Sequence, residues 1–441
     1  MRQAYACLFY IVMNFFKEIN KENLSWALYD WANSAYATTV LAVFFPVFFS
    51  EFWSRGAEAS ITTARIGIAN SLIGVILMII APVLGTMSDI SGSKKKYLMI
   101  ATAGGAISTA GLYFIGGGEW AAALLFYSVS SVCFSTGIIF YDALLSSVAG
   151  KQKYNMVSSF GYALGYLGGG VLLAVNIFMT LKPQMFGLIS GSEAVRLSFV
   201  AVAVWWLVFS IPLFLFVKEK RGDTDKEKIS LRIRKSFIQI LDTFTHIREI
   251  RNVYLFLIAY WLYIDGVDTI IRMAMDFGLS IGLERNSLIT ALLITQFVGF
   301  PAALFTGLIF KGKSGARKGI FLTIFAYFLI TIFGSMMQKE YHFYILAITV
   351  GLVQGGIQAL SRSYFAAIIP EAKSGEFFGF YNMIGKFAVI LGPLFIAVTG
   401  LTLRNFGFSS GAASRGGVLS VSVFFILGGI IFYMSGRDKQ G

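Results

Sequence analysis

Long apolar stretches alternate with short polar connections along almost the whole chain. The stretches are 18–24 residues long, enough for a helix rising ~1.5 Å per residue to cross ~30 Å of hydrocarbon. The stretches lie at 26–49, 66–87, 97–116, 120–140, 157–179, 197–217, 252–272, 287–310, 319–338, 341–361, 377–400 and 418–435. A helix satisfies its own backbone hydrogen bonds in lipid, whereas barrel strands would be shorter and would alternate strictly. The pattern therefore predicts an all-α membrane protein with twelve transmembrane helices.

The composition indicates that lipid is the main solvent. Of the 441 residues, 56% belong to the AVILMFWYC set and 13% are charged, whereas roughly 25% of residues are charged in soluble domains. A soluble chain of this length could not bury so much apolar surface. This excludes a soluble globular enzyme, a disordered chain and a nucleic-acid-binding domain, and it makes the lipid bilayer the expected partner.

Residues that could carry catalysis or hold a metal are scarce. The cysteines are Cys7 and Cys133, and the histidines are His246 and His342, far apart in the sequence. They provide neither a disulfide framework nor the spacing of a metal site or a catalytic triad. The chain also lacks a Walker motif, so ATP is not the expected energy source. We expect no metal, no cofactor and no enzyme activity.

The basic residues indicate an orientation. The net charge of +13 is concentrated in alternate connections, and most of the 36 Lys and Arg residues lie in those on the same side as both chain ends. Lys and Arg are enriched in cytoplasmic loops. We therefore expect a multi-pass, monomeric protein of the plasma membrane (the inner membrane in a bacterium), with both termini in the cytoplasm.

The longest connection divides the chain into two related halves. Residues 157–165 fall on 377–385 at a shift of 220 positions, and the same shift places Asp142 on Arg362. Internal repeats of this kind build a substrate site at the midplane between two halves. The predicted units are an N-terminal extension (1–25), a six-helix bundle (26–217), a linker (218–251), a second six-helix bundle (252–436) and a tail (437–441). In the linker, Ile and Phe at helical spacing over 229–247 predict an amphipathic basic helix on the inner membrane surface.

Several motifs resemble a known family. Gly85-x-x-x-Asp89-x-x-Gly92-x-Lys94-Lys95 resembles the signature between spans 2 and 3 of the major facilitator superfamily. More specific are WALYDWANSAYATTV (26–40), FLIAYWLYIDGV (256–267), GLVQGGIQALSRSYFAAIIP (351–370) and EFFGFYNMIGKFAVILGP (376–393). These four resemble the subfamily that includes the fungal vacuolar amino-acid effluxer and many bacterial permeases. The resemblance implies the major facilitator fold of two pseudo-symmetric six-helix bundles, alternating access and a preference for export.

The resemblance also implies a gate. In the superfamily, the aspartate of this loop tethers neighbouring helix ends in one gating state, so Asp89 would be the tether here, with Lys94 and Lys95 as its basic partners. Gly85 and Gly92 would allow close approach and a tight turn. The alternative is that the lysines serve only as topology anchors.

Ionisable residues inside a span are costly and therefore need a reason. Asp265, Asp268 and Arg272 are offset by three and seven positions, so they share one helix face, which we expect to line a cavity. Arg272 would bind a carboxylate, while an aspartate would bind an amine or carry a proton. A self-neutralising structural pair of Asp268 and Arg272 is the alternative. An intramembrane aspartyl-type enzyme is less favoured, because two carboxylates three residues apart on one helix do not naturally share a proton.

A polar stripe follows the tenth span at intervals of four residues, comprising Gln354, Gln358 and Arg362. Arg362 falls near the cytoplasmic end, and its equivalent in the first half is Asp142. This predicts an ion pair between them that closes the inner side and breaks when that side opens. The alternative is that Arg362 extends to the membrane interface.

Two more pairs complete the candidate site. Asp30 and Asn33 share a face of the first span and echo Asp265 and Asp268 in the equivalent span of the second half. The alternative for Asp30 is a carboxylate that favours a helix N-terminus. Asn382 and Lys386 are four residues apart in the eleventh span, and Lys386 could bind an anionic group.

Mixed acids and bases at a cavity suit a zwitterion better than a sugar or a lipophilic molecule. The expected function is secondary active transport of a small polar solute, such as an amino acid, by alternating access. A proton or a sodium ion is the candidate coupling ion. A membrane solute sensor without transport is the alternative that uses the same cavity.

Overall fold

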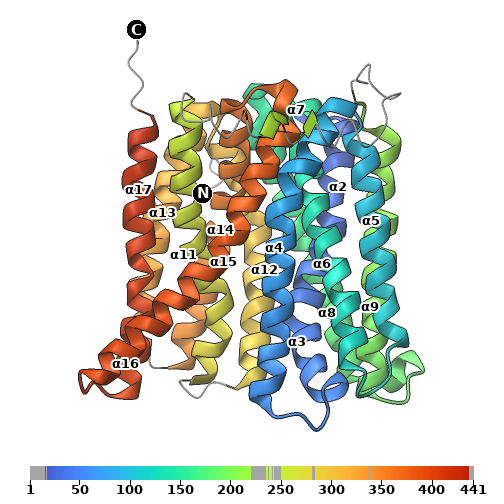
Figure 1. Cartoon of the computed structure of the whole chain (residues 1–441), viewed down its shortest axis with the longest axis vertical. Coiled ribbons are helices and arrows are strands. Elements are labelled where there is room, and N and C mark those ends of the chain that lie inside the picture. Colours follow the sequence, from blue (N-terminus) through green and yellow to red (C-terminus); the bar gives the residue numbers. More distant parts are fainter. Residues whose placement is uncertain are drawn as a thin grey trace, which may run out of the picture.

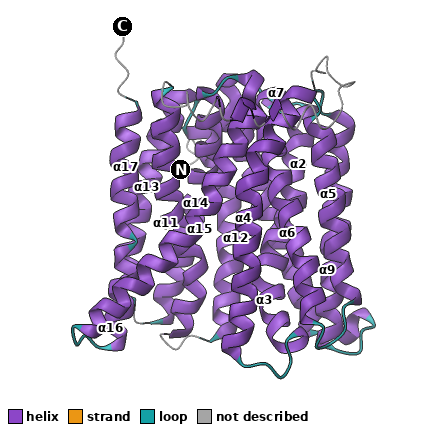
Figure 2. Ribbon diagram, in the orientation of Figure 1, coloured by secondary structure: helices purple, strands orange, loops and turns teal. Residues whose placement is uncertain are grey.

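The computed structural model describes residues 15, 17–219, 235–236, 238–240, 242, 250–280, 284–337 and 339–436. Over these residues the chain is helical and contains no strand. Figure 2 shows the helices side by side, with the loops gathered at the two ends of the bundle. The predicted linker helix over 229–247 lies mostly outside the described residues.

The first half holds six long helical segments. They are α2 (Lys21–Ala35), continued by η1 (Tyr36–Phe44), α3 (Phe45–Phe48) and η2 (Phe49–Trp53), then α4 (Ala59–Ser91), α5 (Lys94–Gly111) with η3 (Leu112–Phe114), α6 (Trp120–Ala143), α8 (Tyr154–Leu181) and α9 (Gly191–Phe216). Short helices α7 (Leu145–Val148), η4 (Lys151–Lys153) and η5 (Pro183–Phe186) lie in the connections.

The second half repeats this plan. It consists of α11 (Arg251–Ser280), α12 (Arg285–Ile309), α13 (Gly312–Ser335), α14 (Glu340–Ile368), η6 (Glu371–Lys373), α15 (Ser374–Asn405), and α16 (Ser410–Ser420) followed by α17 (Ser422–Ser435). Eleven helical segments within the described residues are long and apolar enough to cross a membrane. The remaining predicted span, 377–400, lies in the 32-residue helix α15. The twelve predicted spans are thus confirmed as helices.

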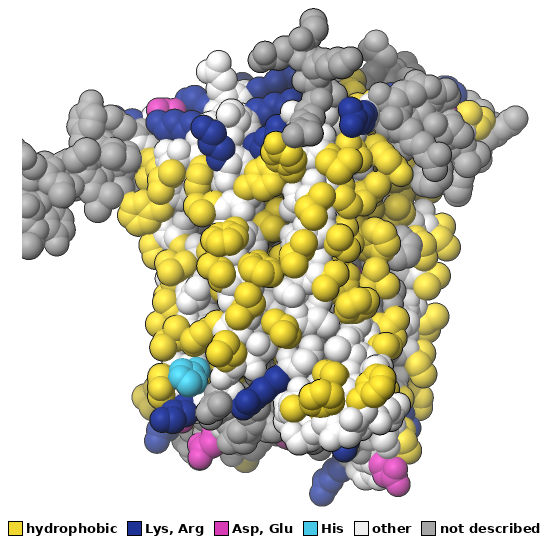
Figure 3. Space-filling model, turned by 90° about the vertical axis from the view of Figure 1, so that its left-hand side faces the viewer, with side chains coloured by type: hydrophobic (Ala, Val, Ile, Leu, Met, Phe, Trp, Pro, Cys, Tyr) yellow, Lys and Arg dark blue, Asp and Glu magenta, His cyan; other side chains and the backbone are white. Residues whose placement is uncertain are grey.

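The surface has an apolar belt between two polar ends. Exposed apolar side chains such as Ile68, Ile107 and Leu125 lie along the helices, and Figure 3 shows hydrophobic side chains over the middle of one face, with Lys and Arg gathered above them. We call the end that carries Lys94, Lys151, Lys311 and Lys373 the basic end, and the end that carries Gly118, Gly187 and Lys339 the opposite end. In Figure 1 the basic end is uppermost.

The two halves meet along two equivalent helix pairs. α4 packs against α15, and α8 packs against α12, while α8 also contacts α14. The 220-residue shift relates α4 to α12 and α15 to α8, so the two main contacts are pseudo-symmetric copies. Side-chain chemistry at these contacts therefore determines how the halves are held together.

Candidate functional site

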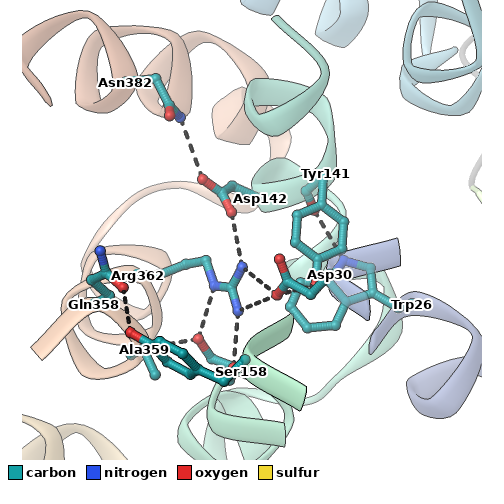
Figure 4. A network of polar contacts seen from close by, with 10 residues as sticks. Trp26, Asp30, Tyr141, Asp142, Ser158, Gln358, Ala359, Arg362 and Asn382 are labelled. Atoms are coloured by element: carbon teal, nitrogen blue, oxygen red, sulfur yellow. Dashed lines mark hydrogen bonds and ion pairs between the residues drawn. The ribbon is translucent and has the colours of Figure 1, made fainter. Parts of the chain in front are cut away.

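Arg362 of α14 is the centre of a polar network that joins the two halves near the basic end (Figure 4). Its guanidinium lies 3.1 Å from Oδ1 of Asp142 on α6 and 3.3 Å from Oδ2 of Asp30 on α2. Its Nε donates to Oγ of Ser158 on α8 at 2.9 Å, and its Nη2 donates to the Ser158 carbonyl at 2.9 Å. The arginine is only 2% exposed. The predicted Asp142–Arg362 pair is therefore present, and Arg362 does not extend to the membrane interface.

Aromatic rings of the first half enclose the guanidinium. The Arg362 Cζ atom lies 4.3 Å from the ring centre of Tyr162, 4.8 Å from that of Trp26 and 5.3 Å from that of Tyr141. Rings at this distance attract a cation through their π faces. Tyr141 also donates its hydroxyl to Asp30 Oδ2 at 2.7 Å, and Trp26 donates its indole N–H to the Tyr141 carbonyl. The rings exclude water and hold Asp30 in position.

The local sequence explains how these groups approach so closely. Gly161 of α8 faces Asp30, and a Cβ at this position would lie 2.7 Å from Asp30 Oδ2 and 3.0 Å from the Trp26 ring. Glycine is therefore required where α8 crosses α2. Asn382 of α15 completes the network by donating its amide N–H to Asp142 Oδ2 at 3.4 Å.

The energetic consequence follows from burial. Removing one partner of a buried ion pair leaves an uncompensated charge and typically costs about 3–5 kcal/mol. Arg362 belongs to the second half, whereas Asp30, Asp142 and Ser158 belong to the first. The two halves can therefore separate at this end only if Arg362 exchanges these partners for water or another ligand.

A second contact between the halves is made by Asp89 at the end of α4. Its Oδ1 accepts the backbone N–H of Gly375 at 2.9 Å and its Oδ2 accepts that of Glu376 at 2.8 Å, both in the first turn of α15. A carboxylate at a helix N-terminus is stabilised by unpaired N–H groups and by the helix dipole. Lys94 also pairs with Asp89 at 2.9 Å. Asp89 thus links the end of α4 to the start of α15, at the place where the tether is predicted.

The two glycines of the motif have the predicted conformational roles. Gly92 ends α4 in the left-handed region with a φ of 59°. A Cβ on Gly85 would overlap the Gly375 carbonyl oxygen, so Gly85 allows α4 and α15 to touch.

The prediction that Lys95 is a partner of Asp89 is wrong. Lys95 donates its Nζ to the Val217 carbonyl at 2.5 Å, and the backbone N–H groups of Lys94 and Lys95 donate to Glu219 at 2.6 and 3.1 Å. Glu219, the last residue of the described stretch 17–219, therefore caps α5. Burial raises the pKa of the Glu219 carboxyl, and these N–H groups and lysines partly offset the shift.

A third contact was missed from the sequence. Asn155 at the start of α8 donates its amide N–H to the carbonyls of Phe310 at 2.6 Å and Gly312 at 2.8 Å, at the end of α12 and the start of α13. The 220-residue shift relates Asn155 to Gly375, so this contact is the pseudo-symmetric counterpart of the Asp89 contact. The donor is again at the start of the equivalent helix, but it is a side-chain amide instead of backbone N–H groups. Asn155 carries no charge, so it did not stand out as a candidate in the sequence. Its alignment with Gly375 at the 220-residue shift would have indicated this contact.

Between the halves, on the opposite-end side of this network, lies a cavity of about 260 Å³. The first half contributes Ala37, Thr38 and Ala42, and the second half contributes residues of α11, α12 and α14, including Thr295, Gln296 and Gln354. Gln354 precedes Arg362 by two helical turns, about 12 Å along the axis. Uncharged hydroxyl and amide groups are the polar part of a mainly apolar wall.

The candidate residues divide between the network and the cavity. Gln354 lines the cavity as predicted. Gln358 accepts a hydrogen bond from Tyr166 at 3.3 Å, which joins α14 to α8. Asp30 is held by Arg362 and Tyr141 instead of lining the cavity, and Asn33, on the same helix, is buried.

The acidic residues of α11 differ from the predicted arrangement. Asp265 is fully buried and accepts a hydrogen bond from the Gly392 N–H of α15 at 2.9 Å, so it faces a neighbouring helix of its own half and not the cavity between the halves. The reason is that α15 comes close to this face of α11 at Gly392, so that the Gly392 N–H meets the carboxylate. Asp268 is partly buried. The side chains of Arg272 and Lys386 lie outside the described residues.

Comparison with known proteins gives the family context. The family model described as "Vacuole effluxer Atg22 like" matches residues 19–154 and 146–400. An "Uncharacterized MFS-type transporter YxiO" of Bacillus subtilis is 39% identical over 417 residues, which cover 94% of this chain and 95% of the relative. The "Autophagy-related protein 22" of Eremothecium gossypii is 19% identical and covers 90% of this chain and 89% of the relative.

Solved structures give the same fold. The human organic anion transporter MFSD10 has a TM-score of 0.69 at 13% identity, covering 93% of this chain and 99% of that one. The major facilitator transporter FucP in its outward conformation has a TM-score of 0.66 at 12% identity, covering 96% and 99%. The predicted all-α fold of two six-helix bundles is confirmed, and these relatives and neighbours are transporters and not enzymes.

Proposed function

Since this chain belongs to the vacuole effluxer Atg22-like family of major facilitator transporters, we propose that it moves a small polar solute, such as an amino acid, by alternating access. The observation that carries the proposal is the asymmetry between the two ends. Arg362, Asp89 and Asn155 join the halves at the basic end, whereas the 260 Å³ cavity lies on the other side of Arg362.

The three contacts are the proposed gate. Each one links a side chain of one half to an atom of the other half, and all of them lie where the helices reach the basic end. Opening this end requires that the Asp89 carboxylate leave the first turn of α15 and that Arg362 leave Asp30 and Asp142. If the opposite end closes over the cavity at the same time, the solute is transferred across the bilayer.

The cavity sets limits on the solute. At about 260 Å³ it lies below the range of about 300–1,000 Å³ that holds drug-sized ligands, so a small molecule is favoured. Thr38, Thr295, Gln296 and Gln354 offer hydroxyl and amide groups, while the aliphatic wall accepts an apolar part. An amino acid combines both characters. Asp268, Arg272 and Lys386 stay candidates for the charged groups, and Asn382 for a polar group, that meet it in another state.

The orientation follows from the distribution of charge. Lys and Arg gather at the basic end (Figure 3), and the enrichment of these residues in cytoplasmic loops supports a cytoplasmic position for that end. The described conformation is then closed toward the cytoplasm. Both termini would be cytoplasmic, in the plasma membrane, with a monomer as the transporting unit.

Counterflow into proteoliposomes tests this function. Vesicles loaded with one unlabelled amino acid should accumulate the labelled form of the same compound transiently, and Arg362→Ala should lower the rate. Gly150→Ala is the matched control, because a Cβ at Gly150 would meet no atom within 4 Å. Binding of a solute without counterflow would indicate a sensor and contradict transport.

A further inference from the structure

Asp265 of α11 lies against the bend in α15. Its Oδ1 accepts the Gly392 N–H at 2.9 Å and the Thr269 hydroxyl at 3.3 Å. Pro393 follows Gly392 inside α15, and proline lacks the N–H that would continue the helical ladder. Figure 1 shows the half of α15 beyond this region sloping away toward α16.

The approach of the two helices depends on Gly392. A Cβ at Gly392 would overlap the Thr269 hydroxyl and lie 2.8 Å from Asp265 Oδ1. The carboxyl group and the bent backbone therefore form one unit, in which Asp265 supplies an acceptor to an N–H at the bend.

The second oxygen of the carboxyl group has a different environment. Asp265 is 0% exposed, and its Oδ2 makes no hydrogen bond to any atom of the described residues. A buried carboxylate oxygen without a donor is unfavourable, whereas a protonated carboxyl group removes the charge. The environment thus favours a bound proton on Oδ2.

The charged and titratable neighbours do not supply a cation in the part of the chain that the structure describes. On α11 itself the neighbours are Asp268, one turn away, and the tyrosines Tyr260 and Tyr263, while Arg272, seven positions along, has its side chain outside the described residues. α13 contributes Tyr327. Along α17 the titratable residue is Tyr433, and α12 has Arg285 at its first position.

The remaining two helices carry their basic residues elsewhere. On α14 the nearest basic residue toward the basic end is Arg362, which is held by Asp30 and Asp142, while Glu340 and His342 lie at its first turn. α15 carries Lys386, whose side chain lies outside the described residues, and Arg404 near its far end.

A small cavity adjoins this unit. It encloses about 40 Å³ and is lined by Thr269 together with residues of α13, α14 and α15, including Gly334 and Ile396. This volume is sufficient for a water molecule, and Thr269 and Thr331 are the polar side chains of a lining that is otherwise apolar. Gly334 and Met337 are at the end of α13 that faces the opposite end, so the cavity extends from Thr269 in that direction.

We propose that Asp265 is a proton-binding site that couples proton movement to the bending of α15. A proton from the opposite end reaches the carboxyl group by the cavity beside Thr269 and stays on Oδ2 while α15 is bent. Movement of α15 as the basic end opens withdraws the Gly392 N–H, exposes the carboxyl group and releases the proton to the other side. The proposal rests on the proposed transport function and adds the proton as its coupling ion.

Infrared difference spectroscopy tests the site without a solute. The full chain in lipid vesicles is compared between acidic and alkaline buffer, and the C=O stretch of protonated carboxyl groups is recorded. In the wild type, one such band should be present in acidic buffer and disappear in alkaline buffer. Asp265→Asn should lack this band, whereas Asp268→Asn, the matched control, should show the same band and the same change as the wild type. An identical band in Asp265→Asn and the wild type would overturn the proposal.

A transport measurement separates this proposal from the proposed function. With a solute identified by counterflow, Asp265→Asn should keep counterflow but lose accumulation driven by a proton gradient. Accumulation that follows a sodium gradient, or that stays proton-driven in Asp265→Asn, would overturn proton coupling through Asp265 while transport itself stands. A carboxyl band that depends on Asp265 in a protein without counterflow would support the proton site and contradict the transporter.

Discussion

Arg362 and Asp142 form an ion pair of 3.1 Å although they occupy equivalent positions in the two halves, 220 residues apart. A pseudo-two-fold axis relates the two halves, and equivalent residues of the halves lie close together where this axis passes between them. If the two residues were identical, their like charges would repel. Because their charges are opposite, Arg362 and Asp142 instead attract each other and hold the two halves together at this position.

The first prediction concerns this pair. Arg362→Ala and Asp142→Ala should each lower the thermal unfolding temperature, because either change leaves a buried charge without its partner. The double variant should be less impaired than the sum of the two single variants, with a coupling energy of about 0.5–3 kcal/mol. Thermal unfolding of purified protein measures this cycle, and strict additivity would show that the two residues are not partners.

The second prediction concerns Asp89. Asp89→Asn should weaken the contacts with Gly375 and Glu376, since each hydrogen bond to a charged group contributes about 1.5–3 kcal/mol. Ser88 is fully buried beside this contact, so Ser88→Cys can report opening of the basic end. A membrane-impermeant thiol reagent should label this cysteine faster in Asp89→Asn.

The control for this experiment is Lys95→Gln, because Lys95 Nζ donates to Val217 and is not the partner of Asp89. An unchanged labelling rate in Asp89→Asn, or an equal increase in both variants, would remove Asp89 from the gate.

The third prediction concerns helix packing beside the network. Gly161→Ala places a methyl group 2.7 Å from Asp30 Oδ2 and should cost about 1–3 kcal/mol of stability through overpacking. Gly150→Ala should change the free energy of unfolding by less than about 0.5 kcal/mol, because its Cβ meets open space. Equal unfolding temperatures for the two variants would contradict the packing described for α8 and α2.

The fourth prediction concerns pH. Burial raises the pKa of Glu219 above its ordinary value. The folded protein therefore binds this proton more tightly than the unfolded chain does, so the contribution of Glu219 is largest below the ordinary carboxyl range and is lost as pH rises through the raised pKa. Unfolding temperatures across this range should fall more steeply in the wild type than in Glu219→Gln, and parallel curves would contradict the assignment.

The sequence predicts the fold well because lipid imposes a simple rule on each span. A span must be apolar and of sufficient length, so the twelve stretches identify their helices without knowledge of the packing. The Asp89 contact and the Arg362–Asp142 pair were also predictable, because one belongs to a recognisable motif and the other follows from the 220-residue shift. Both signals depend on charges, which are rare in this chain.

The remaining contacts depend on helix rotation and bending, which periodicity does not determine. Asp265 and Asp268 share a helix face in the sequence, but the bend of α15 at Gly392 and Pro393 decides that Asp265 meets a backbone N–H instead of the cavity. Asp30 was expected to line a cavity, yet the close approach of α8 at Gly161 and the ring of Tyr141 position it for Arg362.

A distance measurement across both ends tests most directly whether Arg362 holds one side of an alternating-access transporter closed. Lys151 and Glu371 lie 3.6 Å apart across the halves at the basic end, and spin labels can be attached there and, at the opposite end, at Gln184 and Lys339, with the native cysteines replaced by serine. In lipid, the wild type should show mainly the short distance at the basic end. Arg362→Ala should lengthen that distance and shorten the one at the opposite end in the same molecules. Distances that stay unchanged at both ends, or that lengthen at the basic end without any change at the other, would contradict the account.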